Sequence, residues 1–331
     1  MKYAYFPGCS LSSTGIEYHL STRLIAPYLG LELAEIPDWN CCGASAAHCT
    51  DHFLAVALPA RNLALAEEMG LNIAVPCAGC YSRLRTAEAA LRSPVQKAEI
   101  ETALGREIKG TSRAFSLLEI VVNEVGLKTL KERVVHPLAG LKAACYYGCL
   151  LVRPPAITGF DDPENPSAMD RLMETLGAEA VDWPFKTECC GGNLAVPRTD
   201  VAMEMSFQIL QMAKAAGAQA VVTACPLCMS NLDLRQKAME EKYGVSLQLP
   251  VFYFTELIGL ALGIAPQLLG IYRHYTDPRP LLAEMERVFK EQEEARREKQ
   301  RAENSGAAKE NKDNKNKNKN KNANGERGER E

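Results

Sequence analysis

Short apolar runs alternate along this chain with longer stretches of helical character. The runs at residues 71–75 (LNIAV) and 220–223 (AVVT) have the length and continuous apolar character of buried parallel strands. Each run follows a helix-like stretch, residues 53–69 and 201–216, which is closed by a glycine, as is common just past the end of a helix. This strand–helix–strand order predicts an α/β fold.

Two further stretches complete the pattern before the chain becomes charged. Residues 87–141 are predicted to be mostly helical, and residues 245–264 to add a strand-like piece and an apolar helix. The most apolar run, residues 257–264, is far shorter than the ~20 apolar residues that a membrane span needs, so it is interpreted as a buried helix.

The C-terminal part has a different composition. A charged helix is predicted for residues 281–303. Residues 304–331 consist largely of Asn, Lys, Glu and Gly, which cannot bury a hydrophobic core. We therefore expect this last segment to be a disordered, charged tail.

The chain repeats itself, and its cysteines mark the repeat. Four cysteines of the second copy each lie 148 residues after their counterparts, and the first lies 140 residues after its own. The second copy therefore carries eight extra residues before its Cys-Cys pair, which we assign to the loop around residues 161–166. The matched residues are Cys9, Cys41, Cys42, Cys77 and Cys80 in the first copy, and Cys149, Cys189, Cys190, Cys225 and Cys228 in the second.

The repeat predicts two pseudo-symmetric domains, each a small, mostly parallel sheet with flanking helices. The first would span residues 1–140, including a helical insert, and the second residues 141–280. Each Cys-x-x-Cys pair directly follows a predicted strand, and the C-terminal ends of parallel strands are where such folds bind ligands.

Composition narrows the possible functions. Hydrophobic content of 47% and charged content of 24% are ordinary for a globular protein, and a net charge of −3 does not favour binding to nucleic acid or to an anionic membrane. The N-terminus lacks the apolar region of a secretory signal, so we expect a cytoplasmic protein. In that compartment, clustered cysteines are typical metal ligands or redox groups rather than disulfides.

The arrangement of the cysteines points to iron. A Cys-x-x-Cys pair alone fits zinc, iron–sulfur or thiol redox chemistry. The side chains of adjacent cysteines diverge, so they do not easily bind one tetrahedral zinc, whereas they can bind different irons of one cluster. Five cysteines per copy also exceed the four that zinc or an ordinary cubane cluster uses. We predict an iron–sulfur cluster in each copy, with zinc in one of the two sites as an alternative.

Two cysteines fall outside the repeat and are interpreted as buried or inert residues. Cys49 has no counterpart in the second copy, and Cys145 lies within a strand-like run. We choose Cys149 over Cys145 as a ligand because Gly148-Cys149 matches Gly8-Cys9.

Other candidate groups are weaker. His48 and His52 could share a helix face near the first Cys-Cys pair, although a surface or capping role is favoured. The chain has no ferredoxin-type cysteine run, dinucleotide-binding fingerprint or Walker A loop, so electrons would have to come from another polypeptide. Basic residues near the motifs could meet an anionic substrate, although solvated surface positions are the default interpretation: Arg83, Arg85, Arg153, Lys186 and Arg198.

The complete motif set resembles the CCG-domain family to which the B subunit of heterodisulfide reductase belongs. The resemblance runs from about residue 1 to residue 264. It rests on Phe6-Pro7-Gly8-Cys9, Trp39-Asn40-Cys41-Cys42-Gly43, Pro76-Cys77-Ala78-Gly79-Cys80-Tyr81, Tyr147-Gly148-Cys149-Leu150-Leu151-Val152-Arg153-Pro154, Asp161-Asp162-Pro163-Glu164, Cys189-Cys190-Gly191-Gly192 and Thr223-Ala224-Cys225-Pro226-Leu227-Cys228.

This resemblance implies more than the spacing does. It implies that each set of five cysteines holds a noncubane [4Fe–4S] cluster and that the two clusters reduce a mixed disulfide, such as that of coenzyme M with coenzyme B, by two one-electron transfers. It also implies two partner polypeptides of the same complex, one ferredoxin-like and one containing flavin. The alternative is a non-catalytic electron-relay or assembly subunit of a larger redox complex, such as a succinate or fumarate reductase.

Overall fold

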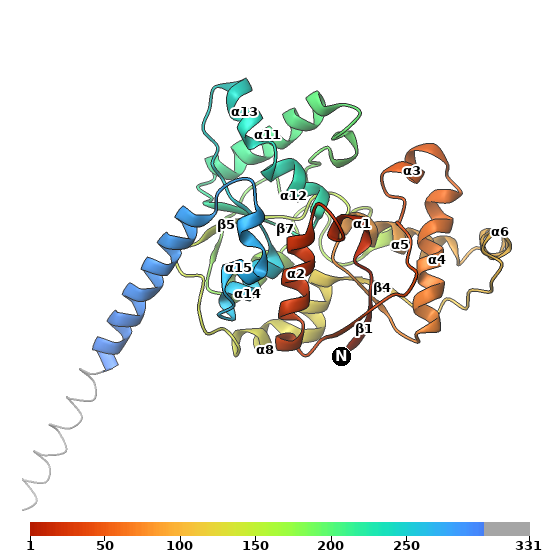
Figure 1. The fold of residues 1–331 in the computed structure, drawn as a ribbon, viewed down its shortest axis with the longest axis horizontal. Coiled ribbons are helices and arrows are strands. Elements are labelled where there is room, and N and C mark those ends of the chain that lie inside the picture. Colours follow the sequence, from red (N-terminus) through yellow and green to blue (C-terminus); the bar gives the residue numbers. More distant parts are fainter. Residues whose placement is uncertain (301–331) are drawn as a thin grey trace, which may run out of the picture.

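Two parallel four-stranded sheets with flanking helices form the computed structural model, which describes residues 1–300 (Figure 1). The strand order is β2-β1-β3-β4 in the first sheet and β6-β5-β7-β8 in the second, so the two sheets have the same topology. The predicted duplicated α/β fold is confirmed. The strands are β1 Lys2–Tyr5, β2 Glu32–Glu35, β3 Ile73–Val75, β4 Ala114–Ser116, β5 Lys142–Tyr146, β6 Glu179–Ala180, β7 Ala220–Thr223 and β8 Val251–Tyr253.

Helices connect successive strands in both copies, as parallel pairing requires. In the first copy they are α1 Gly8–Leu11, α2 Ile16–Ile25, η1 Pro27–Leu29, α3 Ala46–Thr50, α4 Leu54–Glu68, α5 Ala78–Ala90, α6 Pro94–Leu104, α7 Leu117–Glu119, η2 Ile120–Gly126 and α8 Leu127–Lys131. In the second they are α9 Pro155–Thr158, α10 Ala168–Thr175, η3 Gly192–Leu194, α11 Thr199–Ala215, α12 Pro226–Asp233, α13 Gln236–Tyr243, α14 Phe254–Ala261, α15 Pro266–Leu269 and η4 Ile271–Arg273.

The last strand of each sheet shows how closely the copies match. Ser116 of β4 pairs with the end of β3, and Tyr253 of β8 pairs with the end of β7. Ser116 begins its helix through a capping box with Glu119, and at the matching position the backbone N–H of Tyr253 donates to the Glu256 carboxylate at 2.8 Å. The duplication therefore extends beyond the cysteines to helix initiation.

Some elements were not predicted. Residues 87–141 were expected to be mostly helical, but they also contain the three-residue strand β4, which was too short to produce a recognisable alternation. The two-residue strand β6 was not predicted either, nor was β2, in which Glu32 and Glu35 are exposed. These short strands form through pairing with a central neighbour rather than through their own pattern.

The two copies share one continuous hydrophobic core. Helix α2 of the first copy packs against α14 of the second, where the hydroxyls of Ser21 and Thr255 lie 2.7 Å apart. Next to them, the rings of Tyr18 and Tyr253 stack with centroids 4.0 Å apart. The domain boundaries at residues 1–140 and 141–280 stay a prediction.

The charged helix extends over residues 279–300 and projects away from the two sheets (blue in Figure 1). Its first part is held by Phe289, whose ring stacks on His136 with centroids 3.8 Å apart, and by Glu286, which lies 3.1 Å from Nε2 of the same histidine. The predicted tail at residues 304–331 lies outside the described residues. Over residues 1–300, no helix combines the length and apolar character needed to cross a membrane.

A buried ion pair fixes the segment that leads into Cys149. The Lys186 ammonium lies 2.8 Å from one carboxylate oxygen of Asp170, and the Tyr147 hydroxyl donates to the other at 2.6 Å. The carbonyl of Lys186 accepts hydrogen bonds from the backbone N–H groups of Tyr147 and Gly148. The Lys186–Asp170 ion pair and the segment Tyr147-Gly148 at the end of β5 therefore stabilise each other.

We expect Asp170→Asn to lower the free energy of unfolding by about 3 kcal/mol, because the Lys186 ammonium would remain buried without a counter-charge. Urea denaturation measures this change. Asp200→Asn, which removes the exposed partner of Arg198, serves as the control and should leave the unfolding midpoint unchanged. Equal effects of the two substitutions would contradict a special role for the buried pair.

Candidate metal centres

The two cysteine sets lie where parallel strands end. Cys77 stands between β3 and α5, and Cys225 stands between β7 and α12, so the second cysteine of each Cys-x-x-Cys pair lies in the first turn of a helix. Cys9 follows β1 inside the short helix α1. Because the C-terminal ends of parallel strands share one edge of the sheet, cysteines far apart in the sequence are brought together there.

The first set contains two close thiol pairs. The sulfur atoms of Cys42 and Cys80 lie 3.2 Å apart, and those of Cys41 and Cys9 lie 3.8 Å apart. Cys42, Cys77 and Cys80 are buried, whereas Cys9 and Cys41 are exposed. The set therefore has a closed side within the protein and an open side facing solvent.

The second set repeats this arrangement. The sulfur atoms of Cys190 and Cys228 lie 3.5 Å apart, and Cys149 is a hydrogen-bonding neighbour of Cys189. The backbone N–H of Gly191 points to the Cys189 sulfur at 3.3 Å, just as that of Gly43 points to Cys41 at 3.4 Å. The structure thus brings together all ten cysteines that the repeat singles out.

The two sets meet at the boundary between the copies. Ala78, the residue after Cys77, lines the cavity of the second set, and Leu150, the residue after Cys149, lies 3.8 Å from the Cβ position of Gly79, while the buried thiols of Cys77 and Cys225 are near enough to shift each other's pKa. Near this contact, the hydroxyl of Tyr18 donates to the carbonyl of Pro76 at 3.0 Å, and the Tyr18 ring stacks on Tyr253. The pair of rings braces the segment immediately before Cys77.

Hydrogen bonding favours a thiolate at Cys41 and at Cys189, whereas it raises the pKa of their partners Cys9 and Cys149. The thiols of Cys42 and Cys9, together with the N–H of Gly43, lower the pKa of Cys41 to about 2. The thiol of Cys149 and the N–H groups of Gly191 and Gly192 lower the pKa of Cys189 to about 6. Thiolates are the form in which cysteine binds metals, so the second cysteine of each set is prepared as a ligand.

The space between the thiols fits a compact inorganic group. All five cysteines of the second set line one cavity of about 110 Å³, together with apolar side chains such as Leu150, Leu194 and Leu227. No charged side chain lines this cavity among the described residues. Over residues 1–300, no group of three or more His, Cys, Asp or Glu side chains has the arrangement of a single-ion site.

Two glycines leave room for the sulfur atoms. Gly8 and Gly148 have φ values of 68° and 65°, and a Cβ at these positions would lie 3.0 Å from the Cys80 sulfur and 3.2 Å from the Cys228 sulfur. Glycine is suited to both positions because it adopts a positive φ without strain and has no Cβ that would crowd the sulfur atom. The crowded soft sulfur ligands suit iron–sulfur chemistry.

The two cysteines outside the repeat lie away from the cavity lining. Cys145 is completely buried within β5, and its carbonyl accepts a hydrogen bond from the Trp183 indole at 3.2 Å. Cys49 is exposed on helix α3. His48 lies on the same helix and bonds to Arg83 at 3.1 Å, but α3 ends at Thr50, so His48 and His52 do not share a helix face.

The basic residues near the motifs all have partners within the protein. Arg85 pairs with Glu88, Arg153 with Glu164, Lys186 with Asp170 and Arg198 with Asp200, while Arg83 contacts His48. The structure therefore gives each of these side chains a structural contact.

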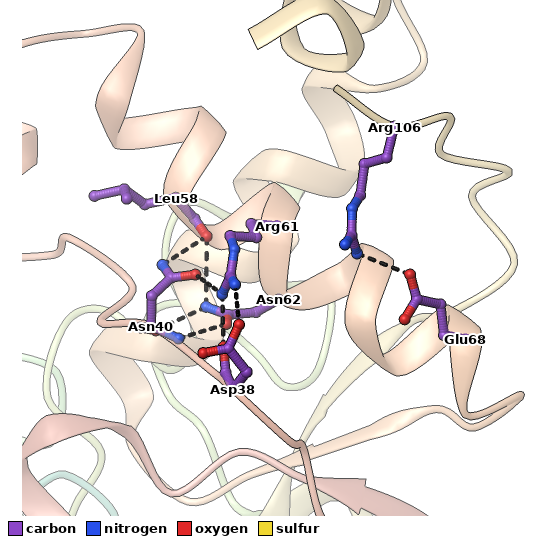
Figure 2. A network of polar contacts seen from close by, with 7 residues as sticks. All are labelled: Asp38, Asn40, Leu58, Arg61, Asn62, Glu68 and Arg106. Atoms are coloured by element: carbon purple, nitrogen blue, oxygen red, sulfur yellow. Dashed lines mark hydrogen bonds and ion pairs between the residues drawn. The ribbon is translucent and has the colours of Figure 1, made fainter. Parts of the chain in front are cut away.

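A polar network beside Cys41 was not anticipated from the sequence. Asn62 and Arg61 of α4 bond to Asn40 and Asp38, in the loop that leads into the first Cys-Cys pair (Figure 2). In the sequence, Asn40 stands out only as part of the motif around the first Cys-Cys pair and not as a hydrogen-bonding residue. The one available signal was the pair of polar residues Arg61-Asn62 within the otherwise apolar helix α4.

Comparison with known proteins gives consistent matches. The family model described as a cysteine-rich domain, CCG, matches residues 3–85 and 143–233. The 8-methylmenaquinol:fumarate reductase membrane anchor subunit of Wolinella succinogenes is 38% identical over 279 residues, which cover 83% of this chain and 97% of that protein. The B subunit of the ferredoxin:CoB-CoM heterodisulfide reductase of Methanosarcina mazei is 34% identical, over 82% of this chain and 92% of that protein.

A solved structure has the same fold at low sequence identity. It is described as a hypothetical protein from Helicobacter pylori and matches with a TM-score of 0.67 and 14% identity. The match covers 83% of this chain and 52% of that chain. This likeness concerns the fold alone.

We expect Gly8→Ala to lower the bound iron to about half, because its Cβ would press against the Cys80 sulfur and disturb only the first set. Iron analysis of the anaerobically purified chain measures this loss. Gly30→Ala is the matched control, since Gly30 has the same φ of 68° but nothing within 4 Å of its Cβ position. If Gly30→Ala also loses iron, the effect is due to backbone strain and not to contact with the Cys80 sulfur.

Proposed function

The chain belongs to the cysteine-rich CCG-domain family that includes the heterodisulfide reductase B subunit, and we propose that it reduces a disulfide as the iron–sulfur subunit of a heterodisulfide reductase-like complex. Relatives named as reductase subunits identify it as a redox iron–sulfur subunit that works with partner subunits. The proposed finer role rests mainly on one observation: two matching sets of five cysteines meet at one boundary.

We assign a noncubane [4Fe–4S] cluster to each set, with zinc in one of the two sites as the alternative. When bound, each cluster would supply one electron at a time. The ligands are Cys9, Cys41, Cys42, Cys77 and Cys80 for the first, and Cys149, Cys189, Cys190, Cys225 and Cys228 for the second.

The protein's own contribution is to bind and orient two electron-transfer centres side by side. Reduction of a disulfide consumes two electrons and two protons and produces two thiols, so two adjacent one-electron centres match the requirement. The contact between Cys77 and Cys225, together with the Tyr18–Tyr253 stack, supports the short separation between the sets. The apolar lining of the second set limits the access of water to its buried side.

The electron source would be other polypeptides. We propose a ferredoxin-like partner and a flavin-containing partner within one complex, in line with the lack of ferredoxin, flavin and nicotinamide motifs in this chain. The cytoplasmic location stays a prediction, since one relative is named a membrane anchor subunit.

A second function is an electron-relay or assembly subunit of a fumarate reductase-type complex. The 38% identity with the Wolinella protein, over 97% of its length, favours this alternative. The uncharged lining of the second cavity also fits it, because residues 1–300 place no cation there to bind an anionic disulfide. In this case the active site would lie on a partner.

Anaerobic purification with bound partners, followed by iron, zinc and sulfide analysis, tests both functions. We expect about eight irons per chain, as two four-iron clusters. The reduced complex should then be reoxidised by an organic disulfide, with two electrons consumed per disulfide. Reoxidation by fumarate or a quinone, but by no disulfide, would establish the relay function instead. About one zinc and about four irons per chain would disprove the two-cluster assignment.

Single ligand substitutions test the residue assignment. Cys42→Ser and Cys190→Ser should each lower the iron content from about eight to about four per chain, because each removes a buried ligand of one cluster only. Cys145→Ala and Cys49→Ser are the controls and should retain all of the iron. The ligand assignment is wrong if both Cys42→Ser and Cys190→Ser keep full iron.

A further inference from the structure

A buried asparagine side chain holds the loop before the first Cys-Cys pair by hydrogen bonds to both backbone groups of one loop residue. Asn62 is completely buried on helix α4. Its amide oxygen accepts a hydrogen bond from the backbone N–H of Asn40 at 3.0 Å, and its amide nitrogen donates to the backbone carbonyl of Asn40 at 2.9 Å. One planar amide thus satisfies both backbone groups of the residue that precedes Cys41, which fixes the position and the orientation of the peptide.

The side chain of Asn40 extends this contact to the cysteine itself. Its amide nitrogen donates to the carbonyl of Leu58 at 3.1 Å (Figure 2). The same nitrogen donates to the carbonyl of Cys41 at 2.9 Å. Arg61 donates to the oxygen of the same amide at 3.1 Å. The Asn40 amide is therefore held from both sides, with its nitrogen directed at the ligand's backbone.

Arg61 also stabilises an unfavourable turn. Asp38 has a positive φ of 53°, a conformation that non-glycine residues rarely adopt. The Arg61 guanidinium donates to the Asp38 carbonyl at 2.6 Å and forms an ion pair with its carboxylate. Figure 2 shows Arg61 and Asn62 gathered against the loop, whereas the Arg106–Glu68 ion pair lies apart from it.

The second copy holds its loop by different contacts. The carbonyl of Cys190 accepts hydrogen bonds from the hydroxyl of Ser206 on α11 at 3.0 Å and from the amide of Asn231 on α12 at 2.9 Å. Both of these side chains are buried. The residue before the pair, Glu188, accepts a hydrogen bond at its carbonyl from the Tyr146 hydroxyl at 2.6 Å, so a tyrosine of β5 and not an asparagine of the following helix contacts this position.

We propose that Asn62, supported by Asn40 and Arg61, is a positioning residue for the first cluster alone. This inference rests on the proposed function, because it requires that Cys41 and Cys42 bind a cluster. The ligand sets of the two copies are equivalent, but their supports are not. The stability of the first cluster can therefore be changed without any change to the second.

Asn62→Leu tests this assignment, since leucine has a similar volume but leaves the N–H and carbonyl of Asn40 unpaired. The variant should retain about half of the wild-type iron, because the first site would no longer hold its cluster. Glu68→Gln is the matched control on the same helix, because it removes only the exposed contact to Arg106 and should behave as wild type.

Combination with ligand substitutions shows which cluster is affected. In a Cys190→Ser background, Asn62→Leu should remove the remaining iron and its visible absorption. In a Cys42→Ser background, Asn62→Leu should change neither the iron content nor the visible absorption. Loss of iron in the Cys42→Ser background would show a general structural effect and would overturn the assignment.

A milder variant covers the case in which Asn62→Leu fails to fold. Asn40→Ala removes the side-chain bonds to Leu58 and Cys41 from a partly exposed position and should accelerate iron release from the first site only. If the wild type binds two clusters and both variants retain them at wild-type rates, the positioning role is wrong and the proposed function stands. If the wild type binds no iron, the proposed function itself fails.

Discussion

Close packing of cysteine thiols is the constraint on which the structure depends. Within one set, sulfur atoms lie 3.2 to 3.8 Å apart, yet they come from separate chain segments. Neighbouring thiolates repel one another, so each added negative charge makes the next thiol harder to ionise. A flexible chain would separate them. Here the parallel strands fix where the cysteines emerge, and the backbone N–H groups of Gly43 and Gly191 partly offset the charge.

Features encoded in residue identity could be predicted from the sequence. The matching spacing in the two copies identified the ten cysteines that the structure gathers into two sets, because a repeated residue type at a repeated spacing is visible in the sequence, whereas their role as metal ligands stays a prediction. The strands at residues 71–75 and 220–223 were also recognisable from their continuous apolar character. Helix α11 begins at Thr199, two residues before the predicted start, and such ends depend on local contacts rather than on the pattern.

The supports of the site could not be predicted, since they arise from tertiary contacts. Asn62 meets Asn40 across 22 residues, and no periodicity marks either of them as a partner. The basic residues show the same limit. Lys186 was expected to be a solvated surface residue, but it is buried against Asp170, because the chain folds a carboxylate onto it. The sequence indicates which residues can bind a metal, whereas the fold determines what holds them in place.

The boundary between the copies determines what the two centres can do together. Separate domains would place two clusters at a variable distance, but here one core runs through both copies and Tyr18 stacks directly on Tyr253. A shift of one copy against the other would break this stack and separate Cys77 from Cys225. The shared core therefore fixes the position of one cysteine set relative to the other, which is the arrangement that the proposed two-electron reduction requires. The nearby basic side chains are already paired within the protein, and the cavity of the second set has a lining without charged side chains among the described residues, so in the proposed function the apolar lining and the partner subunits would select the substrate.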